Sequence, residues 1–95
     1  MRDMIYKTQL NRYQFGSQIV MASKDWKALS VGDQGNDLTL WYETDVSTAQ
    51  ISAHTVLVYP TGQGVGIDLS QWIFVGSVQM SDGLVYHVYQ ENEDE

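Results

Sequence analysis

The sequence predicts an all-β fold, a small antiparallel β-sandwich or open barrel of about six or seven short strands with at most one helical turn. Apolar and polar residues alternate with a period of two in most segments, as they do in half-buried strands. Clusters of Gly, Asn, Asp and Ser separate these segments in the way that turns separate strands. The 95 residues suffice for one core. We therefore expect a single β domain at 1–90, followed by an acidic tail at 91–95.

The first half of the chain is expected to contain two short strands at 4–10 and 18–22, with a loop at 11–16 between them. Residues 23–27 are expected to form one helical turn capped by Ser23.

A hairpin follows, with alternating strands at 29–31 and 38–43 around a loop at Gly35-Asn36. In this register Val31 faces Leu40, and Leu29 faces Tyr42. The side chains expected on the opposite face are Ser30, Thr39, Trp41 and Glu43.

In the second half, a strand at 51–59 is ended by Pro60, which cannot donate to a β-ladder. A second hairpin pairs 72–80 with 84–90 through a type I′ turn at Asp82-Gly83. The expected pairs are Met80 with Val85, Val78 with His87, and Gly76 with Tyr89. This register places His87 on the apolar face and Tyr86 on the opposite face.

The charge is unevenly distributed along the chain. All five basic residues lie within the first 27 positions, whereas ten of the twelve acidic residues follow them, and the net charge is −7. This balance disfavours a groove for duplex nucleic acid, which needs several converging bases. An acidic surface would instead suit a basic protein partner, with Glu43, Asp45 and the tail as candidate contacts.

The composition also limits which metal sites and catalytic groups the chain can form. There is no Cys, and His54 and His87 are the only histidines, so we expect no metal and no cofactor. No apolar run reaches the length of a membrane span, and the start is too polar for a signal peptide, so the reducing cytoplasm is the expected compartment. No nucleophile motif is present, and the acids at 33–45 lie mainly at turns. We therefore expect no catalytic residue and no enzyme.

Two sets of residues are candidates for binding. Residues 59–67 form a glycine-rich loop that could approach a phosphate or serve as a linker, but it lacks the Lys-Ser/Thr ending of a P-loop. Exposed aromatic residues on a sheet indicate either a covering partner or a strand that is buried on both faces. The candidates from these considerations are Trp41, Tyr59, Thr61, Gly62, Gln63, Gly64 and Tyr86. His87 is a further candidate for ligand contact, and its alternative role is that of a hydrogen-bonded structural histidine.

The order of motifs resembles a family of small uncharacterised all-β proteins encoded by phages and prophages. The resemblance covers nearly the whole chain, and its most specific part is the segment 74–89. Family members often carry His and Pro after Thr-Gly, where this chain has Gln63 and Gly64. The motifs that carry the resemblance are 5–7, 29–31, Leu40-Trp41, Tyr59 with Thr61-Gly62, 74–79 and 83–89.

The resemblance and the charge together suggest three functions. The first is a non-enzymatic phage accessory protein that acts in the host bacterial cytoplasm, where it binds and neutralises a host protein. The expected target is an anti-phage defence protein, which would make the chain an anti-CRISPR-like or other anti-defence inhibitor. The second is an oligomeric sponge that sequesters a small nucleotide, which would require Lys24 or Arg12 to fold next to the 61–67 loop. The third is a structural or morphogenetic phage component. A homodimer or higher homo-oligomer is expected because strand edges and aromatic residues need cover.

Overall fold

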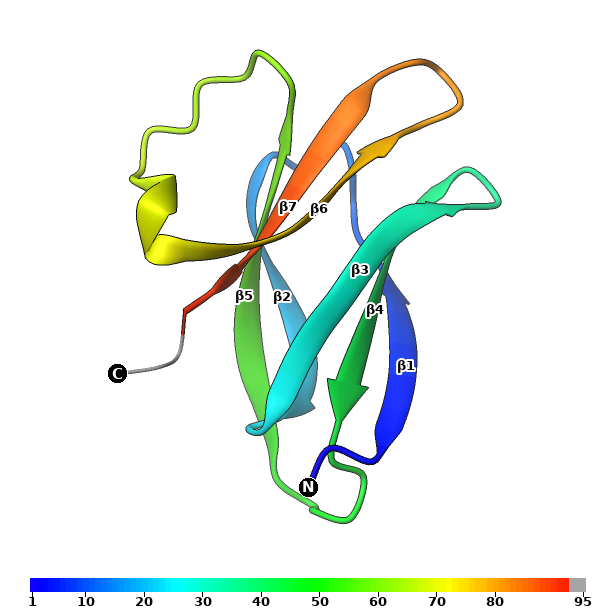
Figure 1. The fold of residues 1–95 in the computed structure, drawn as a ribbon, viewed down its shortest axis with the longest axis vertical. Helices are drawn as coiled ribbons and strands as arrows, with labels where there is room; N and C mark the ends of the chain where they lie inside the picture. The colour runs from blue at the N-terminus through cyan, green and yellow to red at the C-terminus, as the bar shows by residue number, and fades with distance from the viewer. Residues whose placement is uncertain (93–95) are drawn as a thin grey trace.

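A computed structural model describes residues 1–92 and shows seven strands and one short 3-10 helix (Figure 1). The predicted strands are present, each within a few residues of its expected position. The elements are β1 (Met4–Gln9), β2 (Gly16–Ser23), β3 (Trp26–Gln34), β4 (Asp37–Thr44), β5 (Ile51–Pro60), η1 (Leu69–Gln71), β6 (Trp72–Gln79) and β7 (Val85–Glu91).

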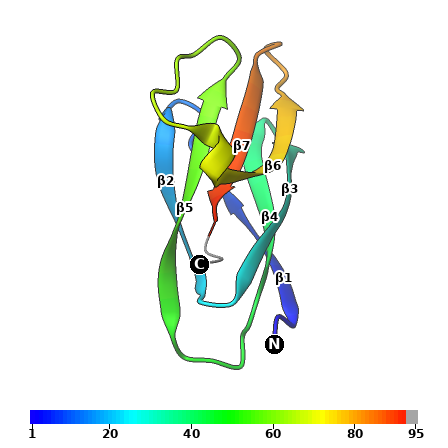
Figure 2. The same ribbon diagram turned by 60° about the vertical axis from the view of Figure 1, so that its left-hand side comes forward.

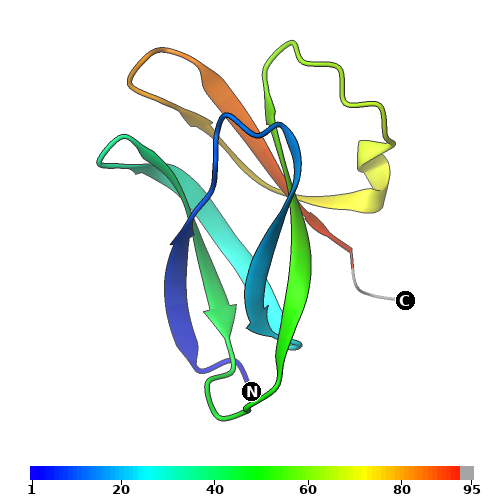
Figure 3. The ribbon, with the colours of Figure 1, turned by 180° about the vertical axis from the view of Figure 1, so that it is seen from behind.

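The strands form two antiparallel sheets, which confirms the all-β prediction in its sandwich form. Sheet A has the order β1-β4-β3, and sheet B has the order β2-β5-β7-β6. The two layers are visible in Figure 2. Figure 3 shows how loop 10–15 carries the chain from β1 in sheet A to β2 in sheet B. The outermost strands are therefore β1 and β3 in sheet A, and β2 and β6 in sheet B.

The core lies between the sheets and is made by inward-facing residues of β2 to β7, whereas β1 contributes no buried residue. Leu40, Val56, Val58 and Val88 have no exposed surface. Burying such aliphatic side chains is the main favourable term in folding, at about 1.5–3 kcal/mol each. The remaining members of the core are Leu10, Val20, Ala22, Trp26, Ala28, Leu38, Tyr42, Val78, Met80 and Tyr86.

The β3–β4 hairpin follows the predicted register only near its loop. Gly35 and Asn36 both have positive φ, 59° and 72°, as a type I′ turn requires, and Val31 pairs with Leu40. The predicted pairing of Leu29 with Tyr42 is wrong, because a β-bulge lies between Ala28 and Ser30 and Ala28 pairs with Tyr42 instead. Leu29 is the extra residue and is 36% exposed.

The register predicted for β6 and β7 is wrong by one residue. The loop has three residues, 81–83, because the Met80 amide donates to the Leu84 carbonyl (2.8 Å) and the Gly83 amide donates to the Met80 carbonyl (2.9 Å). Gly83 alone has positive φ, 88°. Three-residue loops of this kind place one glycine in the left-handed region.

The shift exchanges the two faces of β7. Val78 pairs with Tyr86, and Ser77 pairs with His87. Tyr86, predicted to be exposed, is 1% exposed and belongs to the core. His87, predicted on the apolar face, lies on the outer face of sheet B.

The predicted helical turn at 23–27 is also wrong, because β2 continues to Ser23 and β3 begins at Trp26. The Ser23 hydroxyl accepts a hydrogen bond from the Asp45 amide (2.8 Å), which binds this connection to the end of β4. His54 is buried beside it, stacks on Trp26 at 4.5 Å between ring centroids, and lies 2.8 Å from the Ser23 carbonyl through Nε2.

At the end of the chain, β7 includes Glu91, so the strand reaches one residue into the predicted tail. Glu91 accepts a hydrogen bond from the Thr55 amide (3.0 Å), which explains its place in the sheet. Asn92, the next residue of the predicted tail, is exposed and belongs to no strand, and 93–95 lie outside the described residues. Within 1–92, no helix has the length and apolar character needed to cross a membrane.

Candidate functional site

The candidate site is built around His87 on the outer face of sheet B. Its Nδ1 lies 2.7 Å from the Ser77 hydroxyl, and its Nε2 lies 2.7 Å from the Thr61 hydroxyl. A neutral imidazole has one donor and one acceptor nitrogen, so the two hydroxyls take opposite roles toward the ring. Because both nitrogens are engaged, the orientation of the ring is fixed.

His87 opens onto a pocket of about 280 Å³ in which segments far apart in the sequence meet. Five predicted site residues line it, namely Tyr59, Thr61, Gly62, Gln63 and His87. Gly64, also predicted, belongs to the same loop but is not among the lining residues. The full lining is Tyr59, Pro60, Thr61, Gly62, Gln63, Val65, Leu69, His87 and Tyr89.

The loop that forms one wall of this pocket is held by its own hydrogen bonds. The Thr61 amide donates to the Val85 carbonyl (3.0 Å), which anchors the start of the loop to β7. Gly62 has a φ of 89°, and the Gln63 amide donates to the Pro60 carbonyl (3.2 Å), closing a turn. The Tyr59 hydroxyl then donates to the Val65 carbonyl (3.3 Å).

Asp68 holds the far end of the loop by capping η1. Its carboxylate accepts hydrogen bonds from the Ser70 hydroxyl (2.7 Å) and the Ser70 amide (3.0 Å). These two bonds, the hydroxyl first, hold the pKa of Asp68 below its usual value. The glycine-rich segment is therefore a shaped wall, with Leu69 of η1 placed against the pocket.

Sequence reasoning did not name Ser77, Leu69 and Tyr89 as site residues. It also did not name Pro60 and Val65, although both lie within the 59–67 loop that it singled out. Ser77 was missed because the predicted register paired His87 with Val78, which points into the core. A three-residue loop at 81–83 would have placed Ser77 opposite His87, so the loop length was the signal. The residue pattern does not predict that Leu69 lies at the pocket, because the path of the preceding loop, and not strand alternation, places it there.

Trp41 lies on the other sheet and does not contribute to the His87 pocket. As predicted, it points to the outer face of sheet A, where it is half-buried. Its ring covers Gly32 so closely that a Cβ atom there would lie 3.2 Å from Trp41 Cζ3. Tyr86 lies in the core and is 1% exposed, so its side chain cannot contact a partner.

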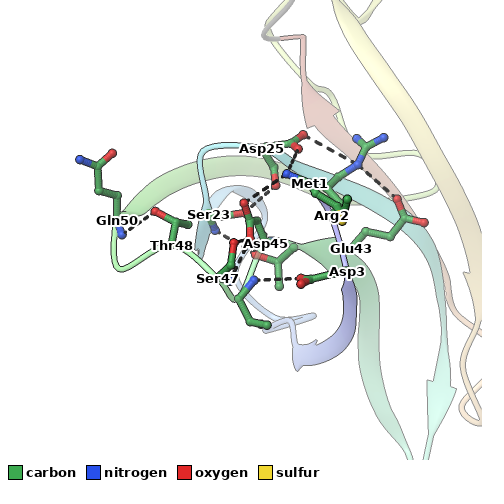
Figure 4. A network of polar contacts seen from close by, with 12 residues as sticks. Met1, Arg2, Asp3, Ser23, Asp25, Glu43, Asp45, Ser47, Thr48 and Gln50 are labelled. Atoms are coloured by element: carbon green, nitrogen blue, oxygen red, sulfur yellow. Dashed lines mark hydrogen bonds and ion pairs between the residues drawn. The ribbon is translucent and has the colours of Figure 1, made fainter.

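Glu43 and Asp45, the predicted acidic contacts, already face cations of their own chain (Figure 4). Arg2 Nε lies 3.4 Å from Glu43 Oε1, and the ammonium group of Met1 lies 3.3 Å from Asp45 Oδ2. Asp45 also accepts hydrogen bonds from the Ser47 hydroxyl and amide, which lower the pKa of Asp45. These carboxylates thus bind the residues before β1 to the end of β4.

The bases considered for a nucleotide do not line the His87 pocket. Arg12 forms an ion pair with Asp82 (3.2 Å) and lies over the Tyr13 ring at 4.9 Å. Lys24 lines a separate cleft. Of the described residues, no Lys, Arg, Asp or Glu lines the His87 pocket.

Within the described part of the chain, no group of three His, Asp or Glu side chains could hold a metal ion. A Ser–His contact is one element of nucleophilic catalysis, but the base is then usually oriented by a third group, often a carboxylate. Here the second partner of the imidazole is the Thr61 hydroxyl. The arrangement can hold a hydrogen-bonding ligand group against an apolar wall.

Comparison with known proteins gives one match. A family model described as a domain of unknown function, DUF7352, matches residues 1–95. No curated protein and no solved structure matches the chain.

Proposed function

The chain belongs to the DUF7352 family, a domain of unknown function, and we propose that it is a non-enzymatic binding protein whose His87 pocket receives a side chain of a protein partner. The expected partner is a host defence protein that the domain neutralises by occupying its surface. The phage setting comes from the resemblance of motifs described above.

The size and polarity of the pocket support this proposal. Its volume of about 280 Å³ is below the roughly 300–1,000 Å³ usual for small-molecule sites. It suits one anchoring side chain, and such anchors are most often aromatic residues or Arg at the centre of an interface. An aromatic anchor fits best, because Leu69 and Tyr89 offer apolar contact while the hydrogen-bonded His87 lies beside them.

The surroundings of the pocket also suit a protein surface. Phe74 is 55% exposed and packs edge-to-face on Tyr89 with ring centroids 5.3 Å apart, and Ile67 in the loop is 47% exposed. Exposed aromatic and aliphatic side chains beside a pocket are typical of the centre of an interface.

A nucleotide sponge acting through the 61–67 loop has less support. A phosphate in this pocket would need a positive charge to replace its hydration, and no Lys or Arg lines it. The glycines alone leave the phosphate charge uncompensated.

The proposal is tested by a matched pair of substitutions on either side of β5, at Gln50 before the strand and at Gln63 in the loop after it. Gln63→Arg places a long charged side chain at the mouth of the pocket, whereas Gln50→Arg makes the same change before the first residue of the strand. Both side chains are exposed. The tagged protein would capture its partner from a host lysate, and titration calorimetry with the purified partner would follow.

We expect Gln63→Arg to raise the dissociation constant at least about tenfold, the loss of a typical anchoring contact. Gln50→Arg should leave it unchanged. Equal affinities for the two variants, or no protein retained by the wild type, would contradict the proposal.

A further inference from the structure

A second cavity lies on the opposite side of β6, between the edge strands of the two sheets. Strands β3 and β6 touch near Gly76, where a Cβ atom would lie 3.1 Å from Val31 Cγ2, and they separate toward their first residues (Figure 1). The space between them is a cleft of about 620 Å³. Leu29 and Val75, the extra residues of two β-bulges, both line it.

The charge of this cleft is opposite to that of the molecule. Arg2, Lys24 and Lys27 line it against one acid, Asp25, although the chain as a whole carries −7. Arg2 is shared between Asp25 and Glu43, at 3.8 Å and 3.4 Å. Neither lysine forms an ion pair with any residue in 1–92. Two uncompensated ammonium groups are thus held beside one cavity.

The wall of the cleft between the charges is apolar. Ile73 is 43% exposed and Leu29 is 36% exposed. These side chains offer a ligand an apolar contact that a simple inorganic anion could not use.

One buried polar group completes the cleft. Gln90 is 8% exposed, and its Oε1 accepts a hydrogen bond from the Ala28 amide (3.1 Å). This bond fixes the orientation of the carboxamide, so the lining side chain presents Nε2 as a donor. Nε2 makes no hydrogen bond to any described residue. Every fully buried side-chain nitrogen or oxygen in residues 1–92 has a hydrogen-bond partner, so Nε2 is not fully buried. Nε2 therefore faces the open cleft.

We propose that the cleft between β3 and β6 binds a phosphate-bearing small molecule of nucleotide size. Lys24 and Lys27 hold the phosphate as point charges, which is how lysine usually recognises it. The ring system lies on Leu29 and Ile73, with Gln90 Nε2 donating to a ring acceptor. The volume of the cleft is within the range usual for such ligands. The site is separate from the His87 pocket and does not depend on the function proposed for that pocket.

The probes are ATP and inorganic pyrophosphate, titrated into the full chain and followed by amide chemical shifts. We expect ATP to shift the amides of Lys27, Leu29 and Ile73 and the side-chain NH₂ of Gln90. The affinity for ATP should exceed that for pyrophosphate by at least about tenfold, because only ATP reaches the apolar wall. Equal affinities for the two probes would overturn the assignment of a nucleotide-sized ligand.

Three variants test whether Lys24 and Lys27 supply the positive charge that holds the phosphate. The double variant Lys24→Ala/Lys27→Ala should raise the dissociation constant for ATP at least about tenfold and flatten its salt dependence. Both lysines are exposed, so folding is retained. Lys24→Gln/Lys27→Gln keeps the side-chain length and should give the same loss. The control is Lys7→Ala, which removes the charge of a lysine outside the cleft that hydrogen-bonds Gln34 (2.6 Å), and it should leave ATP binding unchanged.

The proposal is overturned if ATP shifts no amide of the cleft at about 5 mM, a concentration that would reveal even weak binding. It is also overturned if the shifts map to the His87 pocket, or if Lys7→Ala weakens binding as much as the double variant does.

Discussion

Two buried hydroxyls close the connection between β2 and β3. The Ser23 amide donates to Thr44 Oγ1 (3.0 Å), and Thr44 Oγ1 donates to the Ser23 hydroxyl (2.9 Å). Ser23 is 1% exposed and Thr44 is 5% exposed, so water cannot replace either bond. The network allows a two-residue connection between the sheets without a helical turn.

Thr44→Val should therefore destabilise the protein by about 1–3 kcal/mol, the cost of a buried donor left without its acceptor. The substitution keeps the volume and removes the hydroxyl. Urea denaturation would measure the loss, with Thr44→Ser as the control that retains the hydroxyl. A Val variant within about 0.5 kcal/mol of the Ser variant would show that the network contributes little.

Asp45 should make stability depend on acid pH. Its pKa is lowered from the ordinary 3.8, first by the hydrogen bonds from Ser47 and then by the Met1 ammonium group. A group whose pKa is depressed on folding contributes stability above its unfolded pKa and loses it as the pH falls through the folded value. The loss is thus confined to pH values below about 4.

Asp45→Asn tests this pH dependence by comparison with the wild type at two pH values. The variant should be less stable than the wild type near neutral pH. The difference in the free energy of unfolding should be smaller at a second, acidic pH, because protonation of the wild-type carboxylate removes its charge as the pH falls. Denaturant unfolding at both pH values measures the two differences. If they were equal, Asp45 would not be the group responsible.

At the scale of elements, the loop of the β6–β7 hairpin decides which face of β7 carries His87. Gly83 has a φ of 88° and no atom within 4 Å of the position a Cβ would take, so only backbone strain opposes substitution there. Gly64 has the same open surroundings without a positive φ. Substitutions at these two glycines therefore differ in backbone strain alone, because a Cβ atom would meet no neighbouring atom at either position.

Gly83→Ala should cost about 1–2 kcal/mol, because L-residues disfavour the left-handed region. Gly64→Ala should be neutral or stabilising by up to about 1 kcal/mol, since it reduces the freedom of the unfolded chain. Thermal or urea unfolding of the pair gives the comparison. Equal effects at both positions would argue against a strained loop.

The sequence predicted the strands and part of the candidate site for identifiable reasons. Alternation and turn residues locate strands, and Pro60 ends β5, so Tyr59 and the residues after it are correctly placed at one sheet end. Register is harder, because one extra residue reverses the faces. The bulge at Leu29 and the three-residue loop before Leu84 each add one such residue, and local pattern does not distinguish them from regular pairing.

At the scale of the whole molecule, the outer edges of β1 and β2 lie on the same side (Figure 3), and neither pairs with another strand of residues 1–92. Ile5, Ile19 and Met21 on these strands are 59%, 59% and 56% exposed. An apolar edge strand is a template for pairing with another chain. Self-association along this side therefore stays our prediction, with a two-fold dimer as its simplest form.

Light scattering over a range of concentrations should show a mass above that of one chain for the wild type. Ile19→Lys should shift the mass toward that of the monomer, since a charged lysine at an edge opposes pairing. Ile67→Lys, in the loop near the His87 pocket, makes the same change away from the edge and should keep the dimer. A monomer mass at every concentration would contradict the prediction.

The order in which the strands join the sheets has a consequence for synthesis on the ribosome. All three strands of sheet A lie within residues 1–44, and β2 and β5 can pair once residue 60 has emerged. The last two strands then arrive as one hairpin, with β7 adding to the free side of β5. A nascent chain that pauses in the 61–68 loop would hold five strands, with the edge of β5 that later pairs with β7 still unpaired. A chain cut in this loop would yield two fragments, with the second supplying the hairpin that completes the sandwich.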